Sequence, residues 1–193
     1  MRPSPSVRSA IKASSNQLQQ LLAGSGATAT HPLRLLLSEE LRETDKNAIW
    51  NLFEDNMRGL YTTTSFGWDP RRKREQLFDP LSRYILTDVD DRLAAFTMFR
   101  FESEDSEDNV YCYELQVHRD HQRAGLGKQH MRALEVIGDA WQMRKVVLTV
   151  FKENTSALKF YRGFGFSTDE SSPNYLAESS VDYDILSKRL GVS

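Results

Sequence analysis

Gln122-Arg123-Ala124-Gly125-Leu126-Gly127-Lys128 is the stretch of sequence that decides the fold of this chain. It follows a strand-like apolar segment over 110–117 and precedes a segment over 128–142 with the apolar spacing of a helix. Glycines at such a junction let backbone amides turn toward an anion, and the helix dipole favours negative charge there. A bound phosphate group is one interpretation. A tight turn that needs only glycine geometry is the other, and the glycines alone favour neither.

Two common phosphate-binding motifs do not fit this loop. A P-loop needs Gly-x-x-x-x-Gly-Lys-Ser/Thr, and here Gln129 follows Lys128 where a hydroxyl would be needed for magnesium. A dinucleotide-binding fingerprint needs a third glycine at position 130, which is His130, and the strands before this loop are predicted to be antiparallel. The spacing therefore excludes both nucleotide-binding folds.

The segments around the loop predict a mixed α+β fold. Strand spacing over 84–86, 93–101 and 110–117 indicates an antiparallel meander, whose second turn is the acidic run 102–108. A strand over 145–151 follows the helix after the loop, so it needs a crossover and pairs in parallel with the strand over 110–117. A helix over 155–162 and closing strands over 165–168 and 181–186 complete the chain.

The first part of the chain is predicted to add an arm, a strand and two helices. Residues 1–30 form an N-terminal arm with a short amphipathic helix that packs on the domain over 31–193 and ends at Gly24. A strand is expected over 33–37 and a helix over 39–57. Residues 58–68 are expected to be a loop that holds exposed aromatics, and Asp69-Pro70 begins a second, basic helix.

Composition favours a single globular domain and argues against a membrane-spanning, disulfide-bonded or metal-binding protein. With 193 residues and 39% hydrophobic content the chain fits one domain with a real core, and its net charge of −2 gives no overall attraction for nucleic acid or anionic lipid. The apolar runs fall short of the ~18 residues that a membrane span needs. Cys112 cannot form an internal disulfide and resembles a small buried residue more than a nucleophile. His118 and His121 lack a third ligand, so no metal is expected.

Two motifs resemble the GNAT superfamily of N-acetyltransferases. Gln122, Gly125 and Gly127 match its Arg/Gln-x-x-Gly-x-Gly/Ala signature, and residues 154–166 resemble its Asn-x-x-Ala-x-x-Phe-Tyr…Gly-Phe pattern. The resemblance covers residues 32–190. It implies a splayed, mostly antiparallel central sheet with one parallel β-α-β crossover, helices on both faces, and acetyl-CoA held as cosubstrate between the two parallel strands.

Further strings resemble one branch of that superfamily, NatD, which acetylates the N-terminal amine of histone H4 and histone 2A. The strings are 57–61, 66–68, 111–114, 148–152, 171–173 and 182–186. The branch implies substrates that begin Ser-Gly-Arg-Gly-Lys, a monomer that needs no auxiliary subunit, and a cytoplasmic and nuclear location. Phe66 is a departure, because a tryptophan is expected there in relatives.

Acetyl transfer needs a neutral amine, yet an α-amino group has a pKa of about 7.7–8.0 and is largely protonated at neutral pH. Glu114 is the candidate base. The strand pattern alone favours an outward, salt-bridged carboxylate, whereas the resemblance favours catalysis. Glu102 either shares this role or holds the substrate, and Tyr113 belongs to the same catalytic group. Tyr161 either protonates the leaving thiolate or packs on the cofactor.

The resemblance also implies the binding residues. A strand bulge is expected to free the amides of Leu115 and Val117 for the oxyanion. The expected contacts of acetyl-CoA are Leu115, Gln116, Val117, Gln122, Arg123, Ala124, Gly125, Leu126, Gly127, Lys128, Asn154, Ala157 and Tyr161. The expected contacts of the substrate are Tyr61, Phe66, Glu102, Glu104, Tyr113, Glu114 and Tyr183.

Several of these residues also have structural interpretations. Asn154 fits a helix cap as well as a cofactor contact, Tyr113 and Tyr183 fit the core equally well, and for Glu104 the pattern favours a solvated turn. Arg71-Arg72-Lys73-Arg74 resembles a nuclear-import patch, but such a run is more often the wet face of a helix. For the whole protein, a lysine or small-amine acetyltransferase and a non-catalytic CoA-binding module are the alternatives, and nucleic-acid binding ranks last.

Overall fold

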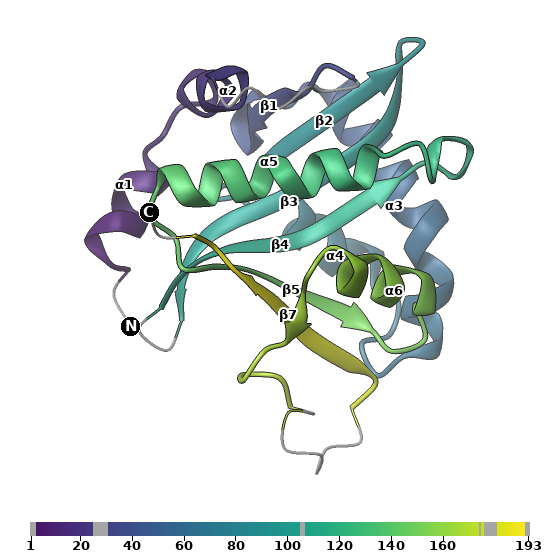
Figure 1. The fold of residues 1–193 in the computed structure, drawn as a ribbon. Helices are drawn as coiled ribbons and strands as arrows, with labels where there is room; N and C mark the ends of the chain where they lie inside the picture. The colour runs from purple at the N-terminus through teal and green to yellow at the C-terminus, as the bar shows by residue number, and fades with distance from the viewer. Residues whose placement is uncertain (1–2, 25–30, 105–106, 174, 176–180, 192–193) are drawn as a thin grey trace.

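A seven-stranded sheet organises the residues that the computed structural model describes, which are 3–24, 31–104, 107–173, 175 and 181–191. The strand order is β1-β2-β3-β4-β5-β7-β6 (Figure 1). The strands are β1 Arg34–Leu37, β2 Arg83–Val89, β3 Arg92–Glu104, β4 Glu107–Val117, β5 Lys145–Phe151, β6 Ser167–Thr168 and β7 Tyr183–Arg189. All neighbours pair antiparallel except β4 and β5, which are parallel. The predicted crossover is confirmed.

Helices cover both faces of the sheet. The described helices are α1 Pro5–Ile11, α2 Ser15–Gly24, α3 Glu43–Thr63, α4 Pro70–Leu77, α5 Leu126–Ala140 and α6 Thr155–Gly163, with short 3-10 turns at Ser38–Glu40 and Arg119–His121. Side chains from α1, α2, α5 and α6 share one apolar core, and those from α3 and α4 share another on the opposite face (Figure 1). The chain therefore has the mixed α/β architecture that the sequence predicts.

The two parallel strands separate partway along their length. Their pairing ends at Cys112 opposite Leu148, although β4 continues to Val117 and β5 to Phe151. Strands that diverge leave one edge of each without a sheet neighbour. This separation creates the opening in which the candidate site lies.

A bulge in β4 lies at the same point. Met98 pairs with Glu114 and Phe99 pairs with Cys112, so Tyr113 is an extra residue with no partner of its own on β3. Side chains normally alternate between the two faces of a strand, and the extra residue interrupts this alternation. Tyr113 and Glu114, although consecutive, therefore both face α3 and α4. The bulge expected near the end of this strand is present.

Several predicted boundaries were wrong. Residues 58–63 continue α3 instead of starting a loop, because Tyr61 extends its apolar face and the hydroxyls of Thr62 and Thr63 bond back to earlier carbonyls. The helix also starts later than predicted, at Glu43, because the Asp45 carboxylate accepts the backbone amide of Arg42 and caps the helix there.

The acidic run and the N-terminal arm also differ from expectation. Glu102–Glu104 and Glu107–Asp108 pair as strand residues, and positions 105–106 lie outside the described part of the chain. The arm holds two helices where one was expected, and Val7, Ala10 and Leu18 are fully buried against the sheet and α5. Within the described residues, none of the helices combines the length and apolarity that crossing a membrane requires.

Candidate active site

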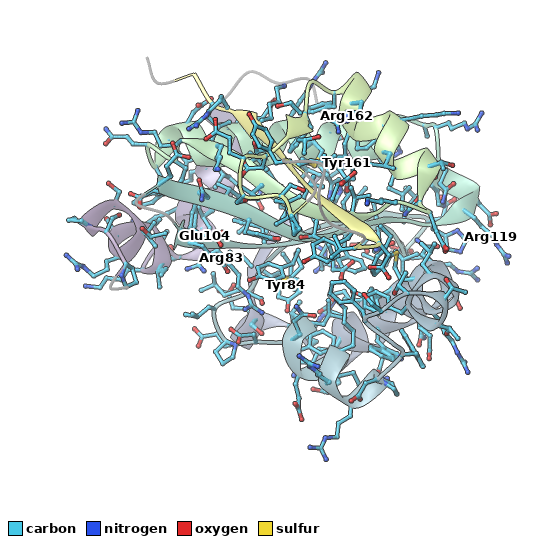
Figure 2. The ribbon with its side chains drawn as sticks, turned by 90° about the horizontal axis from the view of Figure 1, so that it is seen from below. Arg83, Tyr84, Glu104, Arg119, Tyr161 and Arg162 are labelled. Atoms are coloured by element: carbon cyan, nitrogen blue, oxygen red, sulfur yellow. The ribbon has the colours of Figure 1, made fainter. Side chains whose placement is uncertain are left out.

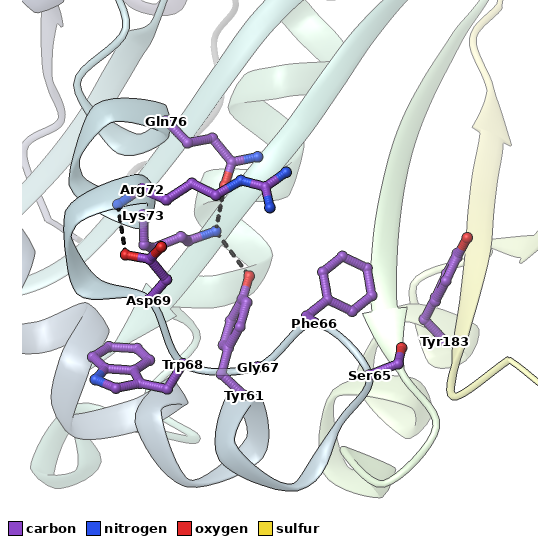
Figure 3. Close-up of a pocket in the computed structure, with 10 residues that line it drawn as sticks. All are labelled: Tyr61, Ser65, Phe66, Gly67, Trp68, Asp69, Arg72, Lys73, Gln76 and Tyr183. Carbon is purple, nitrogen blue, oxygen red and sulfur yellow. Dashed lines mark hydrogen bonds between the residues drawn. The ribbon is translucent and has the colours of Figure 1, made fainter.

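A cleft occupies the opening between β4 and β5. It encloses about 390 Å³ and is walled by the bulged part of β4, the end of β5, the start of α6, β7 and the ends of α3 and α4. A second, outer chamber of about 570 Å³ adjoins it and is lined by the loop 65–69 between α3 and α4 (Figure 3). The two chambers share Tyr61, Phe66, Lys73, Gln76 and Tyr183. The two chambers therefore adjoin, one beside the loop 65–69 and the other beside the diverging strands.

Glu114 lies on the wall of the inner chamber and is 5% exposed. One carboxylate oxygen is 2.8 Å from the ammonium of Lys73, and the other accepts a 2.8 Å hydrogen bond from the Gln116 amide. The side chain is salt-bridged, as the strand pattern alone indicates, but the bulge turns it inward into the cleft. Its role as the base stays a prediction.

Lys73 was not among the predicted site residues. It is 8% exposed, and its ammonium donates to the Tyr61 hydroxyl at 2.8 Å and the Gln76 amide oxygen at 2.9 Å in addition to Glu114 (Figure 3). Burial lowers its pKa, but the charge of Glu114 and the Tyr61 hydroxyl outweigh burial, so the pKa of Lys73 is raised. Lys73 therefore carries a positive charge inside the cleft at neutral pH.

The interpretation of Arg71-Arg72-Lys73-Arg74 as a wet helix face was wrong at Lys73. Arg71, Arg72 and Arg74 are exposed, with the Arg74 guanidinium 4.0 Å from the centre of the Trp50 ring, but Lys73 is buried. One signal was available in the sequence. Lys73 precedes the buried Leu77 by one helical repeat of four residues, which places both on the inner face of α4.

Aromatic rings form the mouth of the cleft. The Phe66 ring is 5.3 Å from both Phe151 and Tyr183 between centroids, and Tyr61 is 5.0 Å from Phe151. Phe66 is half exposed, whereas burial raises the pKa of Tyr61. Tyr113 also lines the inner chamber. The predicted aromatic substrate contacts thus converge on one opening.

Tyr161 lies on the α6 side of the inner chamber. Among the described residues none hydrogen-bonds its hydroxyl, and burial raises its pKa well above the usual value. Its ring packs against Phe160 and Phe166. The phenol therefore keeps its proton, which suits either of its two predicted roles. Burial also raises the pKa of the Cys112 thiol, which disfavours the thiolate that a nucleophile needs.

The predicted cofactor residues divide between this cleft and the glycine loop. Leu115, Gln116, Asn154 and Ala157 line the inner chamber, and the Asn154 side chain also accepts the Ala157 amide, so it caps α6. Val117 lies at the end of β4 and packs against a small apolar cluster that is separate from the two main cores.

The glycine loop lies outside the lining of the cleft, beyond the end of β4. Gly125 has a φ of +91°, and α5 begins at Leu126, so the amides of its first turn have no partner within the helix. A Cβ on Gly127 would lie 3.2 Å from the Phe160 ring, which gives that glycine a packing role. Gln122 donates to the Val117 carbonyl at 3.2 Å. Exposed Arg123, Ala124 and Lys128 flank the helix start, an arrangement that suits a diphosphate.

Two of the three acidic residues predicted to contact substrate, Glu102 and Glu104, lie outside the lining of the cleft. Glu102 accepts a 2.6 Å hydrogen bond from the Tyr113 hydroxyl, so it stands behind a lining residue. Glu104 is exposed and lies at the end of the sheet opposite Arg119 (Figure 2). It pairs with Glu107, which places it about 20 Å from Glu114 along β4. Neither carboxylate is placed to contact the first residue of a substrate in the cleft.

Other lining residues were not singled out in the sequence. They are Met57, Thr149, Val150, Phe151 and Ile185, which belong to strings that resemble the NatD branch but were not predicted as site residues, and Gln76, which was predicted only as part of a helix. Among the described residues no group of three or more His, Cys, Asp or Glu side chains is arranged to hold a metal ion.

The sequence model of the Acetyltransferase (GNAT) family matches residues 46–166, more than half of the chain. A curated Bacillus subtilis protein named Probable spermine N(1)-acetyltransferase is 29% identical over 79 residues, which is 38% of this chain and 52% of that protein. The chain thus spans about half the length of this relative.

Solved structures share the fold at low identity. The Escherichia coli ribosomal-protein-S18-alanine N-acetyltransferase has a TM-score of 0.58 and 17% identity, covering 84% of this chain and 96% of its own. Arabidopsis thaliana Naa50, solved with a bisubstrate analogue, has a TM-score of 0.55 and 18% identity, covering 81% and 97%. At this identity the likeness concerns the fold alone.

Proposed function

The chain belongs to the GNAT acetyltransferase family, and on that premise we propose that it acetylates the free N-terminal amine of proteins that begin Ser-Gly-Arg-Gly-Lys, as histone H4 and histone 2A do. Acetyl-CoA is the acetyl donor expected for this family. The proposal concerns the acceptor, which membership of the family leaves open.

One observation carries the proposal. The strings that resemble the histone-acetylating branch are scattered over 57–186, yet most of them supply lining residues to the same cleft. Tyr61, Phe66, Tyr113, Glu114 and Tyr183 come from four of these strings and line the inner chamber. If the resemblance came from the shared fold alone, the matching residues would be spread through the core. They instead gather around the cleft, which supports an acceptor shared with that branch.

The residues of the cleft suit amine acetylation. The amine nitrogen forms a bond to the acetyl carbon, the carbon–sulfur bond of the thioester breaks, and the amine proton passes to Glu114 directly or through water. Tyr161 lines the same chamber and keeps its proton, which suits either protonation of the departing sulfur or packing on the cofactor. Acetyl-CoA supplies the activated acetyl group, with Gly125 and the start of α5 as the expected site for its diphosphate.

The charge of the cleft favours a peptide terminus over a polyamine. Among the described lining residues of both chambers, the carboxylates are Glu114 and Asp69. Glu114 is paired with Lys73, and Asp69 caps α4 by accepting the Arg72 amide. The inner chamber thus offers a polycation only a carboxylate that Lys73 already neutralises, and Asp69 lies exposed in the outer chamber. The basic residues of a peptide would lie outside the inner chamber, away from the buried charge of Lys73.

The test uses acetyl-CoA with three acceptors, detected by mass spectrometry. They are a Ser-Gly-Arg-Gly-Lys peptide with a free N-terminus, the same peptide with a blocked N-terminus, and spermine. We expect labelling of the free peptide alone. Equal labelling of the blocked peptide, or preference for spermine, defeats the proposal. Glu114→Gln should reduce turnover by about 10²–10⁴-fold while calorimetry shows retained CoA binding. An unchanged rate would assign proton removal to a different base, whereas CoA binding without acetylation of any acceptor by the unaltered protein would indicate a binding module.

A further inference from the structure

A row of hydrogen bonds between side-chain amides links α3 to Glu114. The Gln116 amide nitrogen donates to the Glu114 carboxylate at 2.8 Å, and the Gln116 amide oxygen accepts a 3.0 Å hydrogen bond from the Asn56 amide nitrogen. The same nitrogen of Asn56 donates to the Val117 carbonyl at 3.2 Å. Gln116 is 6% exposed, so protein groups satisfy its amide in place of bulk water.

The two ends of the row fix the direction of every hydrogen bond in it. The Val117 carbonyl can only accept, so Asn56 must turn its NH2 group toward it, and the same group then meets the oxygen of Gln116. Gln116 is left with its own NH2 group facing Glu114. A turned amide at either residue would place two acceptor oxygens against each other. The row therefore presents a donor to the carboxylate.

Helix and strand geometry bring these side chains together. Asn56 follows the fully buried Phe53 by three residues, so both lie on the face of α3 that packs on the sheet. Glu114 and Gln116 are two residues apart on β4 beyond the bulge, so they project from the same face of the strand. A polar residue at position 56 thus meets polar residues on β4 at an otherwise apolar helix–sheet contact.

The row leaves room on Glu114 for an acceptor amine. An ionised carboxylate offers about four lone-pair sites on its two oxygens. Lys73 and Gln116 each occupy one site, on different oxygens. Sites therefore remain for the amine proton or for a bridging water. Asn56 is not among the described residues that line either chamber, so any effect it has on the reaction passes through β4.

We propose that Asn56 and Gln116 are positioning residues for acetyl transfer. Asn56 fixes the orientation of the Gln116 amide, and Gln116 holds the Glu114 carboxylate where it can receive the amine proton. Neither amide gains or loses a proton in this step. The inference rests on the proposed function in one respect, that an amine is the acceptor and Glu114 takes its proton. It does not depend on which amine that is.

The first experiment removes each amide with little change of shape. Gln116→Met should lower kcat about tenfold and Asn56→Leu about fivefold, because a hydrogen bond to a charged group and the placement of a reacting group both affect rates on this scale. Asn56→Leu should fold, because the Val117 carbonyl keeps its bond from Gln122, and KM for acetyl-CoA should not change. Asn51→Leu, on the exposed face of α3, is the matched control and should alter neither constant.

The second experiment repeats both substitutions in a Glu114→Gln background. Residues that act through Glu114 lose their effect once the base is removed, so each should change the residual rate by about twofold at most. With Glu114 present, the double variant Asn56→Leu/Gln116→Met should be no slower than Gln116→Met alone. Equal losses with and without Glu114, additive losses in the double variant, or unchanged kcat in both single variants overturn the inference.

The same measurements separate this inference from the proposed function. If the protein acetylates a different amine in place of the Ser-Gly-Arg-Gly-Lys peptide, the proposed acceptor is wrong, and the variants measured with that amine decide the inference. If Glu114→Gln leaves the rate unchanged, Glu114 is not the base and the inference is overturned with it. If Gln116→Met does not fold, Asn56→Leu measured with and without Glu114 decides.

Discussion

Ser65 is bonded to Asp182 across the mouth of the cleft. The Ser65 amide donates to one carboxylate oxygen at 2.5 Å and its hydroxyl donates to the other at 2.9 Å. This contact joins the loop between α3 and α4, which carries Phe66, to the segment before β7, which carries Tyr183. The Ser65 amide lowers the pKa of Asp182, so the carboxylate is ionised and the bridge is intact at neutral pH.

We expect Asp182→Ala to weaken acceptor binding more than catalysis. Without the bridge, the loop that positions Phe66 against Tyr183 loses its tether, so KM for the peptide should rise about threefold or more while kcat changes less. Steady-state kinetics at saturating acetyl-CoA would measure both. Asp55→Ala, on the exposed side of α3, is the matched control and should change neither. An unaltered KM in Asp182→Ala would mean that the loop is held by its aromatic contacts alone.

Tyr161→Phe separates proton donation from packing. The ring and its contacts remain, and only a hydroxyl with no bonding partner among the described residues is removed. If the phenol protonates the departing sulfur, kcat should fall about 10²-fold with little change in melting temperature. Tyr111→Phe is the control, because its hydroxyl lines the same chamber but is already bonded to Thr149 at 2.6 Å. Equal rates in the two variants would assign Tyr161 to packing.

Gly125→Ala tests the start of α5. A φ of +91° is strained for any residue with a side chain, so the variant should lose about 1–2 kcal/mol of stability and bind CoA more weakly, because the helix amides shift. Gly59→Ala is the control within α3, where no atom lies within 4 Å of an added Cβ, and it should gain up to about 1 kcal/mol. Chemical unfolding and calorimetry would measure the two effects. Retained CoA affinity in Gly125→Ala would separate the loop from phosphate binding.

Local sequence patterns predicted the sheet well because each strand has its own signal. The strand over 145–151 was predicted with the bounds that β5 has, and the crossover before it required a parallel pair. Helix ends were less predictable. Residues 58–63 have threonines and a glycine that are typical of loops, yet Tyr61 packs on Phe53 and keeps α3 intact. Tertiary contacts here outweigh propensity.

The sequence predicted the β4 residues and the aromatic residues of the candidate site, but it did not predict the buried positive charge of Lys73. Glu114 and Tyr61 were identified, whereas their common partner Lys73 belongs to a basic run that pattern alone assigns to solvent. Long-range pairing decides this, because the bulge at Tyr113 turns Glu114 toward α4. A residue skipped by pairing with β3 leaves no periodic mark in the sequence. Glu102 and Glu104 were predicted as substrate contacts but do not line the cleft, because they pair as strand residues farther along β3.

His130 predicts an acid limit to stability. It is fully buried in α5 between two threonines, with 2.8 Å from Nε2 to the Thr87 hydroxyl and 2.8 Å from Nδ1 to the Thr97 hydroxyl. Burial lowers its pKa from 6.5 to about 3. Between these values the unfolded chain binds a proton that the folded chain does not, so stability falls as pH falls. The contribution is complete above pH 6.5 and is lost progressively toward pH 3.

Urea unfolding at pH 7 and pH 5 would measure this effect. The His130 imidazole should lower the free energy of unfolding by about 2 kcal/mol between pH 7 and pH 5, because each pH unit below its ordinary pKa of 6.5 costs about 1.4 kcal/mol. Glutamine does not titrate in this range. The free energy of unfolding of the His130→Gln variant should therefore drop between pH 7 and pH 5 by about 2 kcal/mol less than that of the unaltered protein, even if the variant is less stable at both pH values. His118→Gln is the control, since His118 is partly exposed, and should keep the slope of the unaltered protein.

Asp45 does not account for the slope, because its pKa is about 2 when folded and 3.8 otherwise, so its contribution is lost only below pH 4. Parallel slopes in His130→Gln and the unaltered protein would show that the acid sensitivity arises elsewhere.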